Sequence, residues 1–509
     1  MKNYLLLFIL AIGLFSCKKN SNEPAPEPEF FVNEDPATFA EVGSIDIGDV
    51  GAAEISAFDP LTKRLFVVNN GTVNKIDVID FSNPAAMTVI KSISMAPYGG
   101  AVNSVAVFDG KLAAAIESVD KQANGKVAVF KTDDYSEVKV ITVGALPDMV
   151  TYSNDGKFII TANEGEPNDA YTNDPVGTVS IISVNENYAV TTLDFSGFEG
   201  QKAALVAKGF RIFGPGLNFA KDIEPEYVTV SEDSKTAWVT LQENNAIAKI
   251  NLTTKTITDI FPLGFKDYSV AGNEIDPSDK NTGTPLASWP VKGIYMPDAI
   301  AVSELNGTPY LFTANEGDSR EYSAFAEVLR VGSKDVKLDP TIFPNATDLK
   351  KEDQLGRLNI TKTLGDTDGD GDFDALYSLG SRSFSVWNGN TGTQVFDSKN
   401  ELDVKTIAAG STFYDDGRSD DKSVEPEGIA IGKIGNKKVA FVGMERADAV
   451  AVYDITDPTK PVYLKLLKCG DAPEGVMIIS AKNSPTKKSL LVVSSENDGV
   501  IKVYTPNTL

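Results

Sequence analysis

Short stretches of alternating apolar and polar residues recur along most of the chain, and polar turns separate them. Each unit opens with Pro followed by Asp or Glu and continues as a strand rich in β-branched residues. A second apolar strand follows and ends near a Glu. The clearest units are 147–164, 225–243, 297–316, 426–445 and 473–496, and two degenerate units begin near Ala53 and Asn103 and end at Asn70 and Glu117. Period-two alternation without helical periodicity predicts strands throughout.

A third and a fourth strand follow most units, as in AIAKINL and TKTITDIFPL after the 225–243 unit. Four short strands per repeat describe one blade of a β-propeller. The sequence therefore predicts an all-β chain that forms a single propeller with repeats similar to the YVTN and WD40 classes. The seven units and the irregular stretch 357–397 together indicate seven or eight blades.

The last unit stops after its third strand, GVIKVY, so its fourth strand has to come from elsewhere in the chain. Residues 41–48 (EVGSIDIG) match the fourth-strand pattern. We expect this N-terminal strand to complete the last blade, because closure removes the open sheet edges that favour aggregation. The propeller domain is predicted to span residues 39–509.

The start of the chain has the features of a bacterial lipoprotein signal. Leu5–Phe15 is an apolar run too short to span a bilayer, and the following Ser16-Cys17 completes a lipobox-like motif. We expect a signal peptide over residues 1–17 with Cys17 as the lipidated residue, and a flexible Pro-rich tether over 18–38. The alternative is a plain secretory signal with a chance Cys. A lipid anchor would place the protein in the cell envelope, on the outer membrane or the cell surface.

The amino-acid composition excludes several kinds of partner, catalytic site and metal site. The chain has 71 acidic and 47 basic residues and a formal charge of −24, which disfavours nucleic acid as a partner. It contains no His and only two Cys, Cys17 and Cys469. These counts exclude Ser-His-Asp catalysis, His-ligated metals and a disulfide framework. Any metal is therefore expected to be hard and oxygen-liganded, which means calcium or magnesium, and calcium is the natural ion for the gathered carboxylates described next.

Acidic residues occur at two fixed positions of the units. In a propeller the first strand of each blade lines the channel, so both positions are predicted to face one channel mouth. The first tier is Asp148, Glu226, Asp298, Glu427 and Glu474; the second is Glu117, Glu164, Glu243, Glu316, Glu445 and Glu496. Gathered carboxylates repel one another unless protons or a cation neutralise them. The alternative is structural: each Glu caps strand ends or pairs with Arg320, Arg382, Arg418 or Arg446.

A second acidic motif, DTDGDGDFD, occupies residues 366–374. Asp366, Asp368 and Asp370, followed by Gly371, match the first half of an EF-hand-type calcium loop, in which alternate oxygens converge on the ion. The motif offers two further ligands, Asp372 and Asp374. Tyr stands where the bidentate Glu of a sensor EF-hand belongs, so a structural calcium loop is predicted. A solvated acidic turn is the alternative.

Several long stretches carry a family resemblance, among them PDMVTYSNDGKFIITANEGEPND and LGDTDGDGDFDALYSLGSRSFSVWN. Over about residues 40–505 the chain resembles the choice-of-anchor I domain, a family of bacterial surface proteins and mesenchyme-specific cell-surface glycoproteins linked to biomineral deposition. The resemblance implies a calcium-associated surface propeller whose members reach the surface by different anchors. It supplies neither a substrate nor a catalytic residue.

Two functions follow as hypotheses. The first is a calcium-loaded, monomeric binding or scaffold module whose ligand is a glycan, a mineral surface, a phosphate ester or a protein, and which meets the membrane only through its lipid anchor. The second is a calcium-dependent phosphoesterase, in which a carboxylate acts as base and Arg320 or Arg446 binds phosphate. The candidate residues are Glu164, Glu226, Asp298, Glu316, Glu427 and Glu445.

Overall fold

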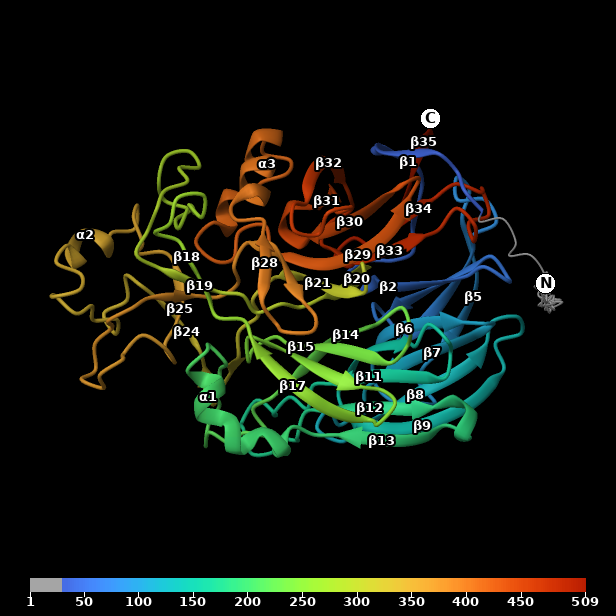
Figure 1. Ribbon diagram of the computed structural model, residues 1–509, viewed down its shortest axis with the longest axis horizontal. Helices are drawn as coiled ribbons and strands as arrows, with labels where there is room; N and C mark the ends of the chain where they lie inside the picture. Colours follow the sequence, from blue (N-terminus) through green and yellow to red (C-terminus); the bar gives the residue numbers. More distant parts are fainter. Residues whose placement is uncertain (1–29) are drawn as a thin grey trace, which may run out of the picture.

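The computed structural model describes residues 30–509. The expected signal peptide, the lipidated Cys17 and the first part of the expected tether lie outside the described residues. Within 30–509 no helix combines the length and the apolar character needed to cross a bilayer. The described chain is built mainly of strands, with a few short helices between them (Figure 1).

Seven antiparallel sheets of four strands each make up most of the described chain. The first four are β2–β5 (Ala52–Asp59, Arg64–Asn69, Lys75–Asp80, Thr88–Ser94), β6–β9 (Val102–Phe108, Lys111–Ile116, Asn124–Lys131, Glu137–Ala145), β10–β13 (Pro147–Tyr152, Phe158–Asn163, Thr178–Ser183, Ala189–Leu193) and β14–β17 (Pro225–Val230, Thr236–Leu241, Ala246–Asn251, Thr256–Pro262). The next two are β20, β21, β27 and β28 (Ile300–Leu305, Thr308–Asn315, Ser383–Asn388, Gln394–Asp397) and β29–β32 (Pro426–Ile434, Lys437–Met444, Ala449–Asp454, Val462–Lys468).

The seventh sheet joins the two ends of the described chain. Its order is β1-β35-β34-β33, with β33 at Pro473–Ile479, β34 at Leu490–Ser495, β35 at Val500–Thr508 and β1 at Glu34–Asp46. The N-terminal strand thus supplies the fourth strand of the last repeat, as the sequence predicts. It begins earlier than expected, at Glu34, so the end of the predicted tether belongs to this strand.

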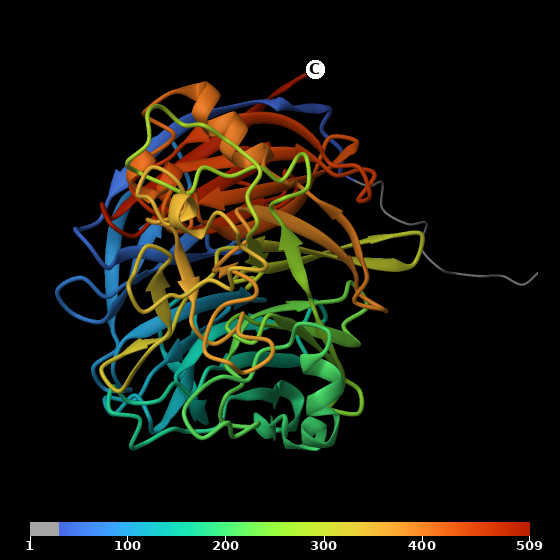
Figure 2. The ribbon, with the colours of Figure 1, turned by 90° about the vertical axis from the view of Figure 1, so that its left-hand side faces the viewer.

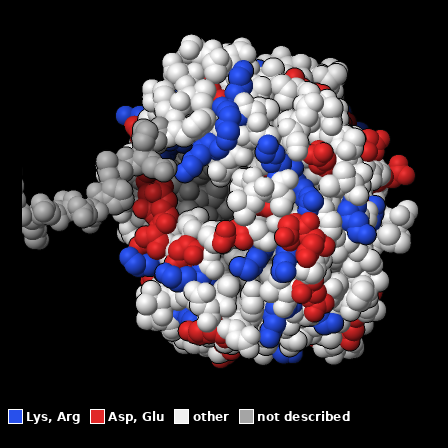
Figure 3. All heavy atoms as spheres, turned by 90° about the vertical axis from the view of Figure 1, so that its right-hand side faces the viewer, with Lys and Arg blue, Asp and Glu red and all other residues white. Residues whose placement is uncertain are grey.

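The first strands of successive sheets contact one another in the order β2, β6, β10, β14, β20, β29 and β33, and β33 also contacts β2. Figures 2 and 3 look onto the two opposite faces that this arrangement creates. Together with the four-stranded sheets, it identifies the fold as a β-propeller. The stretch 357–397, predicted as an additional irregular blade, instead contributes β27 and β28 to the sheet that starts with β20.

Long insertions gather at one end of the molecule, on the left of Figure 1. They contain strands β18 (Phe265–Asp267), β19 (Lys292–Ile294), β22 (Glu321–Tyr322), β23 (Phe325–Ala326), β24 (Val328–Arg330), β25 (Asn359–Thr361) and β26 (Tyr377–Ser378), and helices α1 (Lys202–Val206), α2 (Ala346–Leu349) and α3 (Glu401–Ala409). Part of the insertion has an apolar core of its own, formed by residues such as Tyr268, Leu355 and Ile360. This end is therefore an ordered cover above the propeller.

Burial explains the sequence pattern of the sheets. Middle strands such as β12 are buried along their whole length, whereas the outer strand β5 is almost wholly exposed. Side chains of neighbouring sheets meet between them; Phe66 and Val78 of one sheet pack in one cluster with Leu112 and Phe130 of the next. Each large apolar side chain buried in this way contributes roughly 1.5–3 kcal/mol.

Candidate functional site

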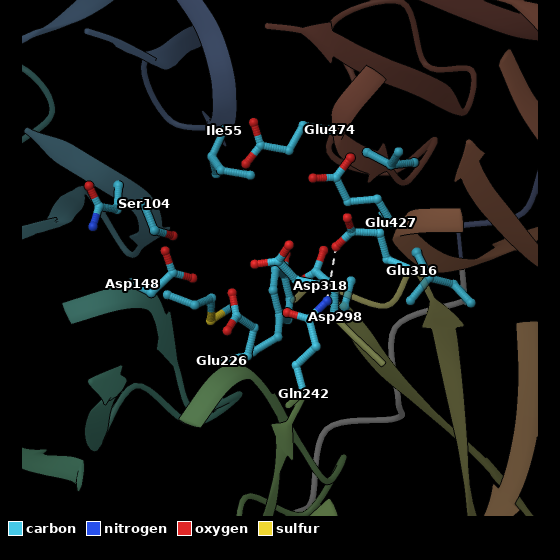
Figure 4. Close-up of a pocket in the computed structure, with 17 residues that line it drawn as sticks. Ile55, Ser104, Asp148, Glu226, Gln242, Asp298, Glu316, Asp318, Glu427 and Glu474 are labelled. Atoms are coloured by element: carbon cyan, nitrogen blue, oxygen red, sulfur yellow. Dashed lines mark hydrogen bonds between the residues drawn. The ribbon is translucent and has the colours of Figure 1, made fainter. Parts of the chain in front are cut away.

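Equivalent residues at the start of the seven first strands lie together at one end of the propeller. They are Glu54, Asn103, Asp148, Glu226, Asp298, Glu427 and Glu474, all but one of them acidic, and they line two adjoining cavities at the insertion end. The inner cavity has a volume of about 270 Å³. Figure 4 shows Asp148, Glu226 and Asp298 reaching into it from three different sheets. The first predicted tier of carboxylates therefore lies together at a channel mouth.

The backbone turns sharply where it enters these strands. The residue before the acidic position, or before its Pro, is left-handed in five units, with φ between 45° and 57° at Ala53, Leu146, Met296, Glu425 and Ala472. This conformation is unfavourable for residues other than Gly and costs of order 1–3 kcal/mol at each position. After this turn the acidic side chain lies at the mouth.

The second predicted tier depends on strand register. Pro147 pairs with Asn163 and Pro426 pairs with Met444, so the next residues, Glu164 and Glu445, lie at the mouth. In the fourth sheet Pro225 pairs with Leu241, which makes Gln242 the equivalent residue. Gln242 lines the cavity, and the predicted Glu243 is instead the following, buried residue with an Oε2 that has no hydrogen-bond partner.

Asp148, Glu164 and Glu226 form the first carboxylate trio. One carboxylate oxygen of each lies within 4.8 Å of the others. Burial raises the pKa of Asp148 to about 7, with a further contribution from Glu166, and raises the pKa of Glu164 and Glu226 well above their ordinary values. No Lys or Arg of the described chain forms an ion pair with this trio, so its charge has no internal compensation.

Asp298, Glu316 and Glu427 form a second trio with the same spacing. Here the protein supplies partners: Nζ of Lys422 lies 2.8 Å from Oε1 of Glu316, and Nε2 of Gln242 donates to Oε2 at 2.9 Å. Burial acts to raise the pKa of Glu316, but the Lys422 ammonium and these hydrogen bonds outweigh it, and the pKa is lowered. The second trio is therefore partly neutralised, although Oε2 of Glu427 is buried without a partner.

Glu445 lies beside this second trio, in a group with Glu316 and Glu425. Burial and the charge of Glu316 raise its pKa to about 7. Arg446 pairs with Glu445 at 2.9 Å and also approaches Glu425. Arg418 and Lys422 complete the basic groups round Glu425, so acidic and basic groups alternate here, whereas the Asp148 trio has no basic partner among the described residues.

The two predicted phosphate ligands differ in their surroundings. Arg320 is buried, with Nη1 2.6 Å from Asp222, Nη2 2.9 Å from Glu224, and its guanidinium over the Phe213 ring. A phosphate would have to displace these carboxylates to reach Arg320. Arg446 is partly exposed but already paired with Glu445.

The predicted calcium loop brings together most of its Asp residues. Asp366, Asp368 and Asp374 form one possible cation group, and Asp374 belongs to a second group with Asp372 and Asp339. Asp370 is in neither group; its Oδ1 accepts a hydrogen bond from the Asp372 amide. Gly369 and Gly371 donate backbone hydrogen bonds to Asp366 and both have positive φ, which explains their place in the motif.

Sequence reasoning missed several residues of the mouth: Glu54, Glu166, Gln242, Asp318 and Lys422. Glu54 occupies the acidic position of a degenerate unit that lacks the opening Pro, so an alignment of the units by strand register would have found it. Lys422 and Asp318 lie in insertions, where no repeat predicts their position. Asp339 was missed for the same reason, because it approaches the 366–374 loop through the pairing of Leu338 with Phe373.

Residues 54–458 match the model of the family described as Choice-of-anchor I domain. The chain belongs to this family. The resemblance inferred from its sequence motifs is thereby confirmed, and the match covers all but the last of the acidic units.

Two named relatives are similar over part of their length. The mesenchyme-specific cell surface glycoprotein of Strongylocentrotus purpuratus is 26% identical over 344 residues, which are 58% of this chain and 44% of that protein. Gigasin-3a of Magallana gigas is 28% identical over 182 residues, 30% of this chain and 64% of that protein. The match thus spans less than two thirds of either relative.

Two solved structures are similar at low identity. The β-propeller domain of Myceliophteria thermophila Cps50 (Swd1) aligns with a TM-score of 0.47 and 7% identity over 92% of this chain and 100% of that one. Kuenenia stuttgartiensis hydrazine synthase aligns with a TM-score of 0.46 and 12% identity over 91% and 98%. These scores are too low to carry an argument, and the propeller fold rests on the sheet topology described above.

Proposed function

We propose that this choice-of-anchor I protein is a surface-associated, calcium-binding propeller that acts as a binding or scaffold module, and that its seven sheets form one ring closed by β1. The surface location is supported by family membership and by the name of the Strongylocentrotus relative. The lipobox-like sequence at Cys17 supports a lipid anchor in the cell envelope.

The uncompensated trio of Asp148, Glu164 and Glu226 carries this proposal. Three carboxylates with closely spaced oxygens supply up to six of the roughly six to eight oxygen ligands that Ca²⁺ takes. Their raised pKa values show that the protein alone disfavours the charged state there. A divalent cation would replace the missing positive charge, and the absence of His and of Cys at the mouth favours a hard ion.

We place a second calcium ion in the 366–374 loop, where Asp366, Asp368 and Asp374 would bind it. Its role would be structural. Asp374 accepts a hydrogen bond from the Thr367 amide, and Phe373 exchanges backbone hydrogen bonds with the 337–339 segment, so an ion there would stiffen the loop at the point where it meets that segment. The second mouth trio is expected to bind calcium more weakly, because the Lys422 ammonium already neutralises part of its negative charge.

Calorimetric titration with Ca²⁺ tests the mouth site. Asp148→Asn with Glu226→Gln removes two of the three charges and should weaken the mouth site by at least about tenfold, while the loop site is retained. Glu199→Gln, an exposed carboxylate with no side-chain hydrogen bond or ion pair, is the matched control and should leave both sites unchanged. Unaltered titration of the double variant, in protein with a parental circular dichroism spectrum, would return these carboxylates to a structural role.

A further inference from the structure

The channel axis has two chemically different ends. β29 and β33 each begin at the acidic mouth, with Glu427 and Glu474, and run to the opposite face. About six residues separate Glu427 from Lys433, so at roughly 3.3 Å per residue the two ends of this strand lie about 20 Å apart. The residues at the far end are therefore outside the calcium site and belong to a different surface.

Two adjoining cavities occupy this far end, with volumes of about 640 Å³ and 320 Å³. Their walls are mainly apolar or lysine-bearing. The apolar groups include Phe30, Phe31, Phe58, Ile431 and Met477; the lysines are Lys433, Lys482 and Lys487. Figure 3 looks onto this face: the surface is hollowed near its centre, with Lys and Arg side chains along one part of the rim and Asp and Glu side chains along another.

Negative charge is nearly absent from these walls, although the chain carries a formal charge of −24. Glu34 is the one acidic residue among those that line the two cavities. Its carboxylate is buried and accepts hydrogen bonds from the amide and the hydroxyl of Ser489 at 2.9 and 2.6 Å. Lys482 and Lys487 are exposed on these walls, so this surface, which we call the lysine face, suits an anionic ligand with an apolar part.

The lysine face is also where the described chain starts. Phe30 and Phe31 are 45% and 49% exposed, and the Lys487 ammonium lies 5.8 Å from the centre of the Phe30 ring. The apolar run Leu5–Phe15 and Cys17 precede Phe30 closely. Residues 18–29 could extend over no more than about 45 Å, so a membrane attachment at or before Cys17 would hold this face near the bilayer.

We propose that the lysine face docks on anionic lipid headgroups, with Phe30 and Phe31 at the bilayer interface, and that the carboxylate mouth consequently faces away from the membrane. The proposal rests on the surface placement proposed above but not on calcium. A single acyl chain gives only marginal membrane binding, and a basic patch beside it is a common second contribution. Aromatic rings and lysine stems are suited to this interface, because their apolar parts enter it while charges stay in water.

Lysine footprinting on the full-length chain tests this docking without a substitution. The protein, extracted from membranes of an expressing bacterium with its own leader, is reconstituted in phosphatidylcholine vesicles with or without phosphatidylglycerol. It is then labelled with a membrane-impermeant amine reagent and analysed by mass spectrometry. Lys482 and Lys487 should label at least about threefold more slowly with phosphatidylglycerol than in detergent, and high salt should abolish the protection. Lys280 and Lys351, exposed residues of the insertions, should not change.

A pair of charge reversals separates lipid docking from other occupants. Lys482→Glu should restore full labelling of Lys487, whereas Lys280→Glu with Lys351→Glu should leave Lys487 protected. Protection that persists in pure phosphatidylcholine and grows with protein density would indicate a second copy. Protection already present in detergent would indicate residues of the N-terminal segment. Either result, or equal labelling of Lys482 and Lys487 under all conditions, would overturn the proposal.

Discussion

At the scale of single residues, Lys422 decides how the two carboxylate trios differ. Its ammonium lies within 3.1 Å of oxygens of both Glu316 and Glu425, and it is itself mostly buried. A resident ammonium satisfies a carboxylate but contributes only one positive charge, so it competes with a divalent ion for the same oxygens. Among the described residues, one trio thus has a basic partner and the other has none.

Replacing Lys422 by Met keeps much of the side-chain volume and removes the charge. We expect the second trio to gain affinity for calcium, so that calorimetry finds about one additional ion per chain. Glu425 keeps Arg418 as a partner, which should preserve the fold. Lys362→Met, which alters a lysine of the insertions, is the control and should leave the stoichiometry unchanged. An unchanged stoichiometry in Lys422→Met would show that charge competition does not set the difference between the trios.

At the scale of secondary-structure elements, β1 joins the start of the described chain to the sheet of the last repeat. It pairs with β35 over most of its length, and Phe39 is fully buried beside Phe441, with ring centroids 5.2 Å apart. Phe39→Ala should lower the free energy of unfolding by about 3–5 kcal/mol, measured by urea denaturation. Val42→Ala, at an exposed position of the same strand, should change it by less than about 0.5 kcal/mol. Equal effects of the two substitutions would argue against a closing role for β1.

The repeat units make the strands predictable from the sequence. Prediction fails where an insertion interrupts a unit. Alternation within each unit identified the strands, and the missing fourth strand of the last unit identified its N-terminal partner. The 357–397 stretch was placed in a blade of its own because the insertion after Asn315 separates β21 from β27, which pair across it. Likewise, the residue type favours Glu243 at the end of the second strand, whereas strand register selects Gln242. Counting from the opening Pro corrects this one-residue error, because Gln242 stands at the same distance from Pro225 as Glu164 does from Pro147.

At the scale of the whole molecule, the propeller collects charges that the sequence scatters over several hundred residues. Repetition alone predicted that the acidic positions converge, because equivalent residues of a closed repeat face the same axis. The compensation of those charges was not predictable, since Lys422, Arg418 and Gln242 come from insertions and from one divergent unit. Which carboxylates remain available for a cation is therefore a property of the folded molecule.

This charge accumulation predicts how stability depends on pH. Burial raises the pKa of Glu54 to about 8 and that of Asp148 to about 7, above the values near 4 of an unfolded chain. Between pH 4 and 8 the folded state therefore binds more protons than the unfolded state, and stability should fall as pH rises through this window. The lowered pKa of Glu316 acts below this window and does not cancel the effect.

Thermal unfolding in EDTA should consequently give a higher Tm at pH 5 than at pH 8. We expect calcium to replace the protons on the mouth carboxylates and to raise the Tm more at pH 8 than at pH 5, because protons compete with the ion at the lower pH. In the Asp148→Asn and Glu226→Gln double variant, the fall in Tm with pH in EDTA should be smaller, as two of the uncompensated charges are gone. A parental slope in that variant would mean that other groups of the protein control its response to pH.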